Sequence, residues 1–291
     1  MSTSASPVPA AFRALVDDAA LFPPGNVPLD EAVVAHARHR QAPYADLVGP
    51  FVVGDAALPE LAGTTGLDVS VVVSGGAGAL APAVAWAGRA GVTLAGVEVA
   101  LRDSATGELA HNARRVVTAV DQLVAGGDLD DEVPVFVEMP RLYGAPPTPD
   151  WLAALDELAA MDHRLKLRTG GLDADAFPGS HELAGCIAAA LDRELAFKCT
   201  AGLHHAVRHR DPETGFEHHG FLNVLRATRA SLDGAAVDEV AALLDEADAG
   251  RLLDGTALDA LAGARRWFTS FGSCSISDPL DDLTELGLVS A

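Results

Sequence analysis

Short runs of β-branched and other apolar residues recur along this chain of 291 residues, with helix-compatible stretches between them. Each run is apolar almost throughout, which is typical of parallel strands buried on both faces. Seven runs are clear, at 47–53, 68–74, 96–101, 133–139, 164–170, 195–202 and 266–272. An eighth precedes them at 14–22. The alternation of strand and helix patterns predicts a series of βα units.

Eight βα units in a chain of this length predict one (β/α)8 barrel, spanning residues 1–291 as a single domain. Residues 1–12 are expected to form a loose N-terminal tail. The strongest helical patterns lie at 104–126, 150–161 and 180–193. The interval 202–266 is unusually long, so we expect a histidine-containing insertion there, after the seventh strand, with about three short helices.

A doubly wound parallel sheet is the alternative fold, and one motif favours it. The segment 71–81, "VVVSGGAGALA", contains Gly76, Gly78 and Ala81 in the G-x-G-x-x-A spacing of a dinucleotide site, and Glu98 follows at the next strand. However, chance matches are common in a chain with 28 glycines, and Pro82 lies where the helix should pack. We therefore interpret this segment as an ordinary turn between a strand and a helix.

Charge and cysteine content narrow the classes of partner. A net charge of −21 would repel both nucleic acid and an anionic membrane, so a small molecule is the expected partner. Three cysteines are too few for a disulfide framework, and the first residues lack a secretory signal, which favours a cytoplasmic location. The uncharged run 69–88 is broken by glycines and a proline, so it is not expected to span a membrane. Assembly into a homo-oligomer stays open.

The twenty basic residues include only two lysines, Lys166 and Lys198, and both lie in apolar runs. Side chains alternate along a strand, so Lys166 shares a face with Arg168, and Lys198 shares one with Thr200 and Gly202. In a barrel these strands are neighbours, and both lysines would point into the interior. Burial and mutual repulsion then predict a depressed pKa for one lysine. A neutral amine can attack a carbonyl group to form a Schiff base.

The segments "KLRTGG" and "FKCTAG", which carry the two lysines, resemble the lysine pair on strands six and seven of class I deoxyribose-phosphate aldolases, which are (β/α)8 barrels. The resemblance implies that Lys166 forms the Schiff base and that Lys198 lowers its pKa. It implies a lyase of aldolase type, for which no cofactor is expected, and we expect a small anionic carbonyl compound as its substrate. The resemblance is confined to these two strands. Arg168 and the continuation "LHHAVRH" depart from the family's pattern.

Two other interpretations of the lysines stay open. Each lysine can be the buried partner of a carboxylate such as Glu98 or Glu138, as a structural device. Alternatively, the lysines and Arg168 can hold an anion without catalysis, in a metabolite-binding barrel. Asp17, Asp18, Glu98 and Glu138 are the acids best placed for a barrel mouth, and Glu138 is the strongest candidate for proton transfer.

A cluster of five histidines lies between residues 204 and 219. His205 and His209 are spaced i,i+4, so on a helix they would share a face, and with His204 they could hold a divalent metal. A metal-dependent hydrolase or isomerase is therefore the second functional hypothesis. Arg208 among the histidines suits an anionic substrate equally well, and His204, next to the seventh strand, is the favoured acid or base.

The eighth strand runs into Gly272 and Ser273 ahead of a helix, where backbone N–H groups of a barrel often hold a phosphate. The predicted catalytic residues are Lys166, Lys198, Glu138 and His204. The predicted substrate-binding residues are Arg168, Thr200, Gly202, His205, Arg208, His219, Gly272 and Ser273.

Overall fold

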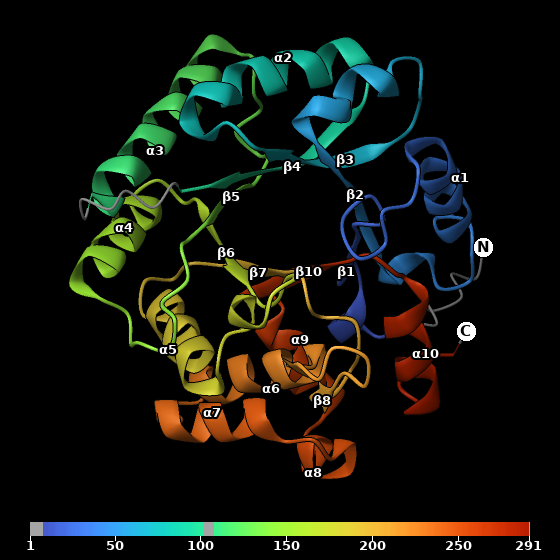
Figure 1. The fold of residues 1–291 in the computed structure, drawn as a ribbon, viewed down its shortest axis with the longest axis vertical. Helices are drawn as coiled ribbons and strands as arrows, with labels where there is room; N and C mark the ends of the chain where they lie inside the picture. The colour runs from blue at the N-terminus through green and yellow to red at the C-terminus, as the bar shows by residue number, and fades with distance from the viewer. Residues whose placement is uncertain (1–7, 102–107, 291) are drawn as a thin grey trace.

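The computed structural model describes residues 8–101 and 108–290. Within them, eight parallel strands form a closed barrel in the order β1-β10-β7-β6-β5-β4-β3-β2 (Figure 1). The strands are β1 Val16–Asp18, β2 Val48–Gly54, β3 Asp68–Val73, β4 Thr93–Ala100, β5 Val135–Glu138, β6 Arg164–Arg168, β7 Phe197–Thr200 and β10 Phe268–Ser273. The predicted (β/α)8 barrel is confirmed.

Helices surround the ring of strands (Figure 1). They are α1 Leu29–His39, α2 Leu80–Ala90, α3 Leu109–Gly126, α4 Pro149–Ala159, α5 Ser180–Leu191, α6 Phe221–Leu232, α7 Val237–Asp245, α8 Ala249–Leu253, α9 Leu258–Ala264 and α10 Ser277–Glu285. The start of the helical pattern predicted at 104–126 falls partly outside the described residues. The other two predicted helices correspond to α4 and α5.

The alternative of a doubly wound sheet is wrong, because β1 pairs with both β2 and β10 and so closes the sheet. An open sheet would leave its two edge strands unpaired. The glycine-rich segment after β3 forms the 3₁₀ turn η4, Gly76–Ala79, and leads directly into α2. This is the ordinary strand-to-helix turn that we expected there.

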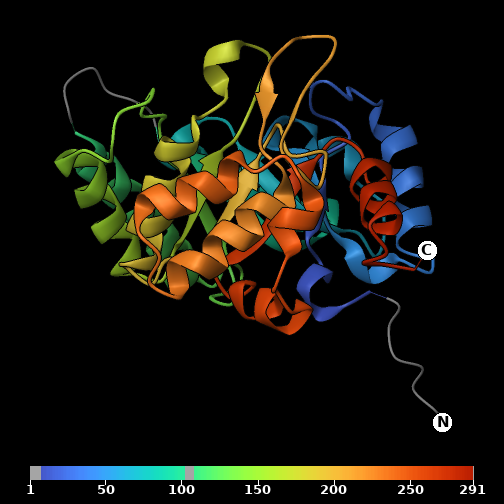
Figure 2. The same ribbon diagram turned by 90° about the horizontal axis from the view of Figure 1, so that it is seen from below.

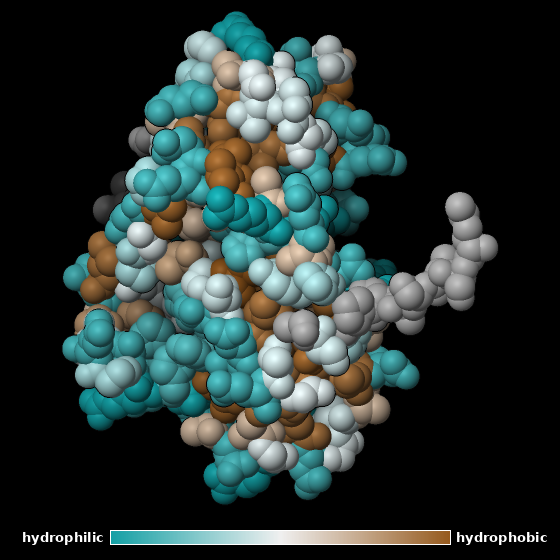
Figure 3. Space-filling model, turned by 90° about the vertical axis from the view of Figure 1, so that its right-hand side faces the viewer, coloured by the Kyte–Doolittle hydropathy of each residue, from teal (hydrophilic) through white to brown (hydrophobic). Residues whose placement is uncertain are grey.

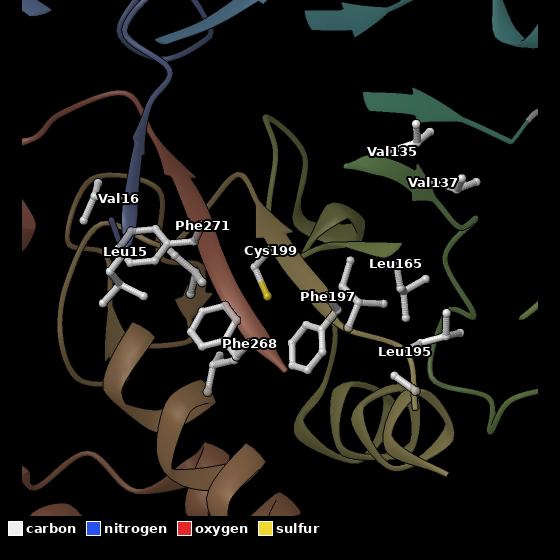
Figure 4. Close-up of a cluster of buried hydrophobic side chains, with 14 of the residues drawn as sticks. Leu15, Val16, Val135, Val137, Leu165, Leu195, Phe197, Cys199, Phe268 and Phe271 are labelled. Carbon is white, nitrogen blue, oxygen red and sulfur yellow. The ribbon is translucent and has the colours of Figure 1, made fainter. Parts of the chain in front are cut away.

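The two faces of the barrel strands differ in chemistry. The outward face carries apolar side chains that pack under the helices, among them Phe197, Phe268 and Phe271 (Figure 4). The rings of Phe197 and Phe268 stack with their centroids 5.5 Å apart, and Phe271 stacks on Phe221 of α6 at 5.1 Å. The inward face carries buried polar and charged side chains instead. Alternation along each strand therefore separates an apolar shell from a polar interior.

The long interval after β7 holds more structure than expected. A two-stranded hairpin, β8 His209–Arg210 with β9 Glu217–His218, comes first, and the four helices α6 to α9 follow. In Figure 2 the hairpin and its loop, drawn in orange, stand out beyond the helices. The helix on which His205 and His209 would share a face does not form, because residues 203–208 are irregular and His209 lies in β8.

The start of the described chain is packed rather than loose. Val8 and Phe12 are fully buried, and the 3₁₀ helix η1, Ala10–Phe12, lies against α9. The expectation of a loose tail over residues 1–12 is therefore wrong for residues 8–12, because their apolar side chains pack against the barrel. Residues 1–7 lie outside the described part.

The molecular surface is largely hydrophilic where Figure 3 shows it, with apolar patches between polar side chains. None of the helices in residues 8–101 and 108–290 has both the length and the apolar character that crossing a bilayer requires.

Candidate active site

Lys166 and Lys198 lie side by side in register on β6 and β7, and both side chains are buried inside the barrel. Carboxylates from three other strands separate and flank them. The Nζ atom of Lys198 lies 2.5 Å from Asp17 Oδ2 and 2.6 Å from Glu98 Oε1. The Nζ atom of Lys166 lies 2.7 Å from Glu98 Oε2 and 3.1 Å from Glu138 Oε2. Glu98 of β4 is thus the bridge between the two lysines.

The ion pairs continue to the barrel mouth. Arg168, two residues after Lys166 on the same strand face, donates from Nε to Glu138 Oε1 at 2.8 Å. The six side chains therefore alternate in sign in the order Asp17, Lys198, Glu98, Lys166, Glu138 and Arg168, and we call them the ion chain. Its positive and negative charges balance when all six groups are ionised.

Two serine hydroxyl groups complete the buried contacts of the ion chain. Ser70 of β3 donates to Glu98 Oε1 at 2.6 Å, and Ser270 of β10 donates to Asp17 Oδ2 at 2.8 Å. Seven of the eight strands thus contribute a side chain either to the ion chain or to its serine partners. A buried charge is tolerated only when it is paired and hydrogen-bonded, and these contacts meet that requirement.

The depressed lysine pKa expected from burial and repulsion does not occur at Lys198. Burial alone would lower the pKa of Lys198, but Asp17 and Glu98 at hydrogen-bond distance raise it above its ordinary value. The expected depression considered only burial and the repulsion between the two ammonium groups, whereas the pairing of the lysines with Glu98 and Glu138, left open as an alternative, is present. Lys198 therefore remains an ammonium ion at neutral pH.

The three carboxylates of the ion chain do not behave alike. Burial favours the neutral form of Glu98, yet Lys166 and Lys198 bring its pKa below the usual range. The pKa of Glu138 is also lowered, because Lys166 and Arg168 outweigh its burial. Burial dominates at Asp17 and raises its pKa in spite of Lys198. Glu98 and Glu138 are consequently ionised at neutral pH.

A cavity of about 350 Å³ lies over the ion chain, at the carboxyl ends of the strands. Lys166, Lys198, Glu98 and Glu138 form part of its lining, and Arg168 reaches into it with a side chain that is 39% exposed. The carboxyl ends of the strands are where barrel enzymes carry their active sites. Other lining residues include Phe22, Val52, Val72, Leu172, Thr200, His204, Gly272 and Cys274.

His204 occupies the rim of this cavity, in the loop after β7. Its Nδ1 atom lies 3.3 Å from Ser273 Oγ and 3.5 Å from Asp278 Oδ2. Burial lowers the pKa of His204, although Asp278 opposes this effect, so the imidazole is neutral near pH 7. Cys274 Sγ lies 3.8 Å from His204 Nε2, and burial raises the pKa of this thiol. His204 can therefore exchange a proton at the rim, whereas Cys274 remains a thiol.

Five of the eight predicted substrate-binding residues do not line the cavity, and three of these five lie away from its mouth. His205 and Arg208 line a separate surface hollow with Asp282, whose Oδ2 lies 3.2 Å from His205 Nδ1. His219 is fully buried, with Nε2 2.9 Å from the carbonyl oxygen of Pro178. Its surroundings are those of a structural histidine.

The histidines suggested as metal ligands are only partly brought together. The rings of His205 and His209 lie 4.6 Å apart but nearly perpendicular, and His204 belongs to the barrel cavity. Within the described ranges, no group of three or more His, Cys, Asp or Glu side chains has an arrangement that could hold a metal ion.

Two further predicted residues shape the backbone at the mouth. Gly202 has φ +76°, and a Cβ atom there would lie 2.8 Å from the carbonyl oxygen of Thr169. Ser273 is buried and donates to the carbonyl oxygen of Ser275 at 2.6 Å. Both positions therefore fix loops beside the cavity, while Thr200 and Gly272 line it directly.

Sequence reasoning gave too little weight to Asp17 and missed Ser70 and Ser270. Asp17 was placed among the acids of the mouth, but it lies at the inner end of the ion chain. The serines carry a usable signal, since each lies two residues before a cavity-lining residue, Val72 or Gly272, and therefore shares its strand face.

Comparison of the chain with protein families, with curated proteins and with solved structures finds no match in any of the three. A functional interpretation therefore depends on the geometry of the cavity and of the ion chain.

Proposed function

We propose that this barrel is a lyase of aldolase type, in which Lys166 forms a Schiff base with a small anionic carbonyl compound. The observation that carries the proposal is the position of Lys166. It lines a cavity of about 350 Å³ and lies 3.1 Å from Glu138, the most accessible carboxylate of the ion chain, which is placed to accept its proton. The (β/α)8 fold is compatible with this chemistry but does not specify it.

Lys166 is a better nucleophile candidate than Lys198. Lys198 is held by Asp17 and Glu98 at 2.5 and 2.6 Å, and its Nζ also lies 5.2 Å from the centre of the Phe136 ring. All three contacts favour its charged form. Lys166 also pairs with Glu98, at 2.7 Å, but its second carboxylate is Glu138 at 3.1 Å. The Glu138 side chain is 13% exposed and is the most accessible carboxylate of the ion chain. Lys198 then keeps Glu98 ionised and in position.

The proposed reaction proceeds through a covalent intermediate on Lys166. Lys166 gives a proton to Glu138, and its neutral nitrogen forms a bond to the carbonyl carbon of the substrate. The carbonyl oxygen takes up one proton from the attacking nitrogen and one from Glu138 and leaves as water, which produces an iminium ion on Lys166 and returns Glu138 to its ionised form. This cation then accepts the electron pair of the carbon–carbon bond that breaks, which leaves an enamine on Lys166, while the hydroxyl group of the departing fragment loses its proton and becomes a carbonyl group. Protonation of the enamine carbon and addition of water then release the second product and free Lys166. His204 at the rim is placed to move a proton to or from the departing fragment.

Reduction with borohydride tests the proposal, because it turns an iminium ion into a stable secondary amine. The protein is incubated with a panel of small aldehydes and oxo acids and reduced with borohydride, and its mass is then measured by mass spectrometry. The chain contains only two lysines, so side-chain adducts can form only at Lys166 or Lys198. We expect one adduct that Lys166→Arg abolishes.

The matched variant Lys198→Arg keeps the charge of Lys198 beside Asp17 and Glu98, so it is expected to leave Lys166 able to react, at a lower rate. Circular dichroism spectra of both variants establish that they are folded. A panel that binds without any reducible adduct would instead favour the interpretation as a non-catalytic metabolite-binding barrel.

A further inference from the structure

The cations that line the cavity differ in how far they are already neutralised. Lys166 and Lys198 are 4% and 2% exposed, and each contacts two carboxylates. Arg168 is 39% exposed and pairs with one carboxylate, through Nε alone. Its Nη1 atom lies 3.4 Å from the carbonyl oxygen of Gly170, a weak contact. Among the described residues that line the cavity, Arg168 is therefore the cation best able to accept one more negative charge.

The backbone glycines at the ends of β6 and β7 leave no room for a phosphate group between them. Gly170 and Gly202 pack backbone to backbone, since a Cβ atom on Gly170 would lie 2.7 Å from the Cα atom of Gly202. Thr169 Oγ1 donates to the carbonyl oxygen of Ala201 at 2.5 Å, which holds the two loops together.

The start of α10, after β10, is already occupied by the protein's own acids. The backbone N–H of Asp278 donates to Ser275 Oγ, which in turn donates to Asp278 Oδ1 at 2.9 Å. The carboxylate of Asp282, one turn later, accepts from the backbone N–H of Ala206 at 2.6 Å. A phosphate dianion placed here would face two carboxylates, so the phosphate site expected from Gly272 and Ser273 is not favoured.

The position of Arg168 suits a short ligand that also reaches Lys166. The two side chains leave the same strand face two residues apart, which places their Cα atoms about 6.6 Å apart. A carboxylate paired with Arg168 and a carbonyl carbon at Lys166 Nζ can therefore belong to one small molecule. The apolar side chains of Val52, Val72 and Leu172 line the same cavity and suit an uncharged carbon chain.

We propose that the substrate is an unphosphorylated oxo acid, whose single carboxylate binds the exposed guanidinium of Arg168. This inference rests on the proposed function, because it names the substrate class of the same site. A doubly charged phosphate ester would bring a second negative charge into a site with one available cation. The protein's net charge of −21 also disfavours the approach of a dianion more than that of a monoanion.

Two sets of ligands separate this inference from the proposed function. The first set cannot form a Schiff base and consists of butanoate and propyl phosphate, with binding measured by calorimetry on the full chain. We expect butanoate to bind at least about tenfold more tightly. Equal or tighter binding of propyl phosphate, or no binding of butanoate, would overturn the inference.

The second set consists of 4-oxobutanoate and glyceraldehyde 3-phosphate, followed by borohydride reduction. Faster trapping of 4-oxobutanoate supports the inference, and faster trapping of the phosphate ester overturns it. If neither compound is trapped while butanoate still binds more tightly than propyl phosphate, the Schiff-base function fails and the anion preference stands.

A variant of Arg168 tests the residue itself. Arg168→Gln is expected to weaken butanoate binding about tenfold, because the ligand loses its charged hydrogen-bond donor. Arg114→Gln is the matched control, since Arg114 pairs with Glu157 on the exposed helical surface and lies outside the cavity. Equal butanoate affinity in Arg168→Gln and in the control would overturn the assignment. If Arg168→Gln does not fold, the comparison of the two anions on the unaltered protein still decides the substrate class.

Discussion

Replacing Glu98 by glutamine should destabilise the barrel strongly, because this side chain joins the two buried lysines. Its oxygens lie 2.7 Å from Lys166 Nζ and 2.6 Å from Lys198 Nζ, and its side chain is 2% exposed. Glutamine keeps the shape but removes the negative charge. Two buried ammonium groups then face each other with only Asp17 and Glu138 as counter-ions.

The magnitude follows from the burial of the pair. Removing one partner of a buried ion pair costs about 3–5 kcal/mol of unfolding free energy, since the other charge is left uncompensated. We expect Glu98→Gln to fall in this range. Adding Lys198→Met to Glu98→Gln removes one of the stranded charges, so the double variant should be less destabilised than the sum of the two single variants.

Urea denaturation followed by circular dichroism at pH 7 measures these differences. Glu157→Gln is the matched control, because the ion pair of Glu157 with Arg114 is largely exposed and should contribute less than about 1 kcal/mol. If Glu98→Gln costs no more than this control, the ion chain is not an electrostatically coupled unit and the reasoning is refuted.

Three further predictions concern the surroundings of the ion chain. Ser270→Ala removes the buried hydroxyl that donates to Asp17 at 2.8 Å, so urea denaturation should show a loss of about 1–3 kcal/mol; no loss would mean that Asp17 needs no second donor. Gly202→Ala should lower the free energy of unfolding by at least about 2 kcal/mol in the same assay, because residue 202 has φ +76° and the new Cβ atom would lie 2.8 Å from the carbonyl oxygen of Thr169. An unchanged urea midpoint would contradict this prediction. The pKa of Glu138 in the folded protein lies below its value of about 4.3 in the unfolded chain. Ionised Glu138 therefore stabilises the fold above about pH 4.3, and this stabilisation is lost as the pH falls through the pKa of the folded protein. Between about pH 5 and pH 3 the stability of Glu138→Gln should therefore decline less steeply than that of the unaltered protein, and equal slopes would count against the Glu138 ion pairs.

The sequence predicted the barrel because its strands are buried on both faces and helices alternate with them. The run at 164–170 contains β6, and the run at 195–202 contains β7. Alternation within these runs was enough to place Lys166 and Lys198 on inward faces, in register with each other. This prediction was possible because successive side chains of a strand point to opposite faces, so the sequence alone tells which residues share a face.

Long-range contacts could not be predicted in the same way. Asp17 lies in a strand of three residues, and its partner Lys198 follows 181 positions later. No local pattern relates these two residues, so the pairing of Asp17 with Lys198 and its effect on the pKa of Lys198 were not apparent from the sequence. Glu98 and Glu138 were named there only as possible partners of the lysines, without their order.

The spacing of His205 and His209 was misleading, because the chain between β7 and α6 forms a hairpin instead of a helix. Asp211 accepts hydrogen bonds from the backbone N–H groups of Glu213 and Thr214, and Gly215 adopts φ +73°. This turn brings His209 opposite His218 on the neighbouring strand. The turn-forming residues 211–215 therefore determine the structure of this segment, and the i,i+4 spacing of His205 and His209 does not.

Peptide mapping of the borohydride-reduced adduct tests the central claim most directly. The account predicts that tandem mass spectrometry places the added mass on Lys166, in the peptide that contains β6, and that Lys198 remains unmodified. An adduct on Lys198 with Lys166 unmodified would contradict the assignment of Lys198 as the permanently charged partner, and with it the proposed role of the ion chain.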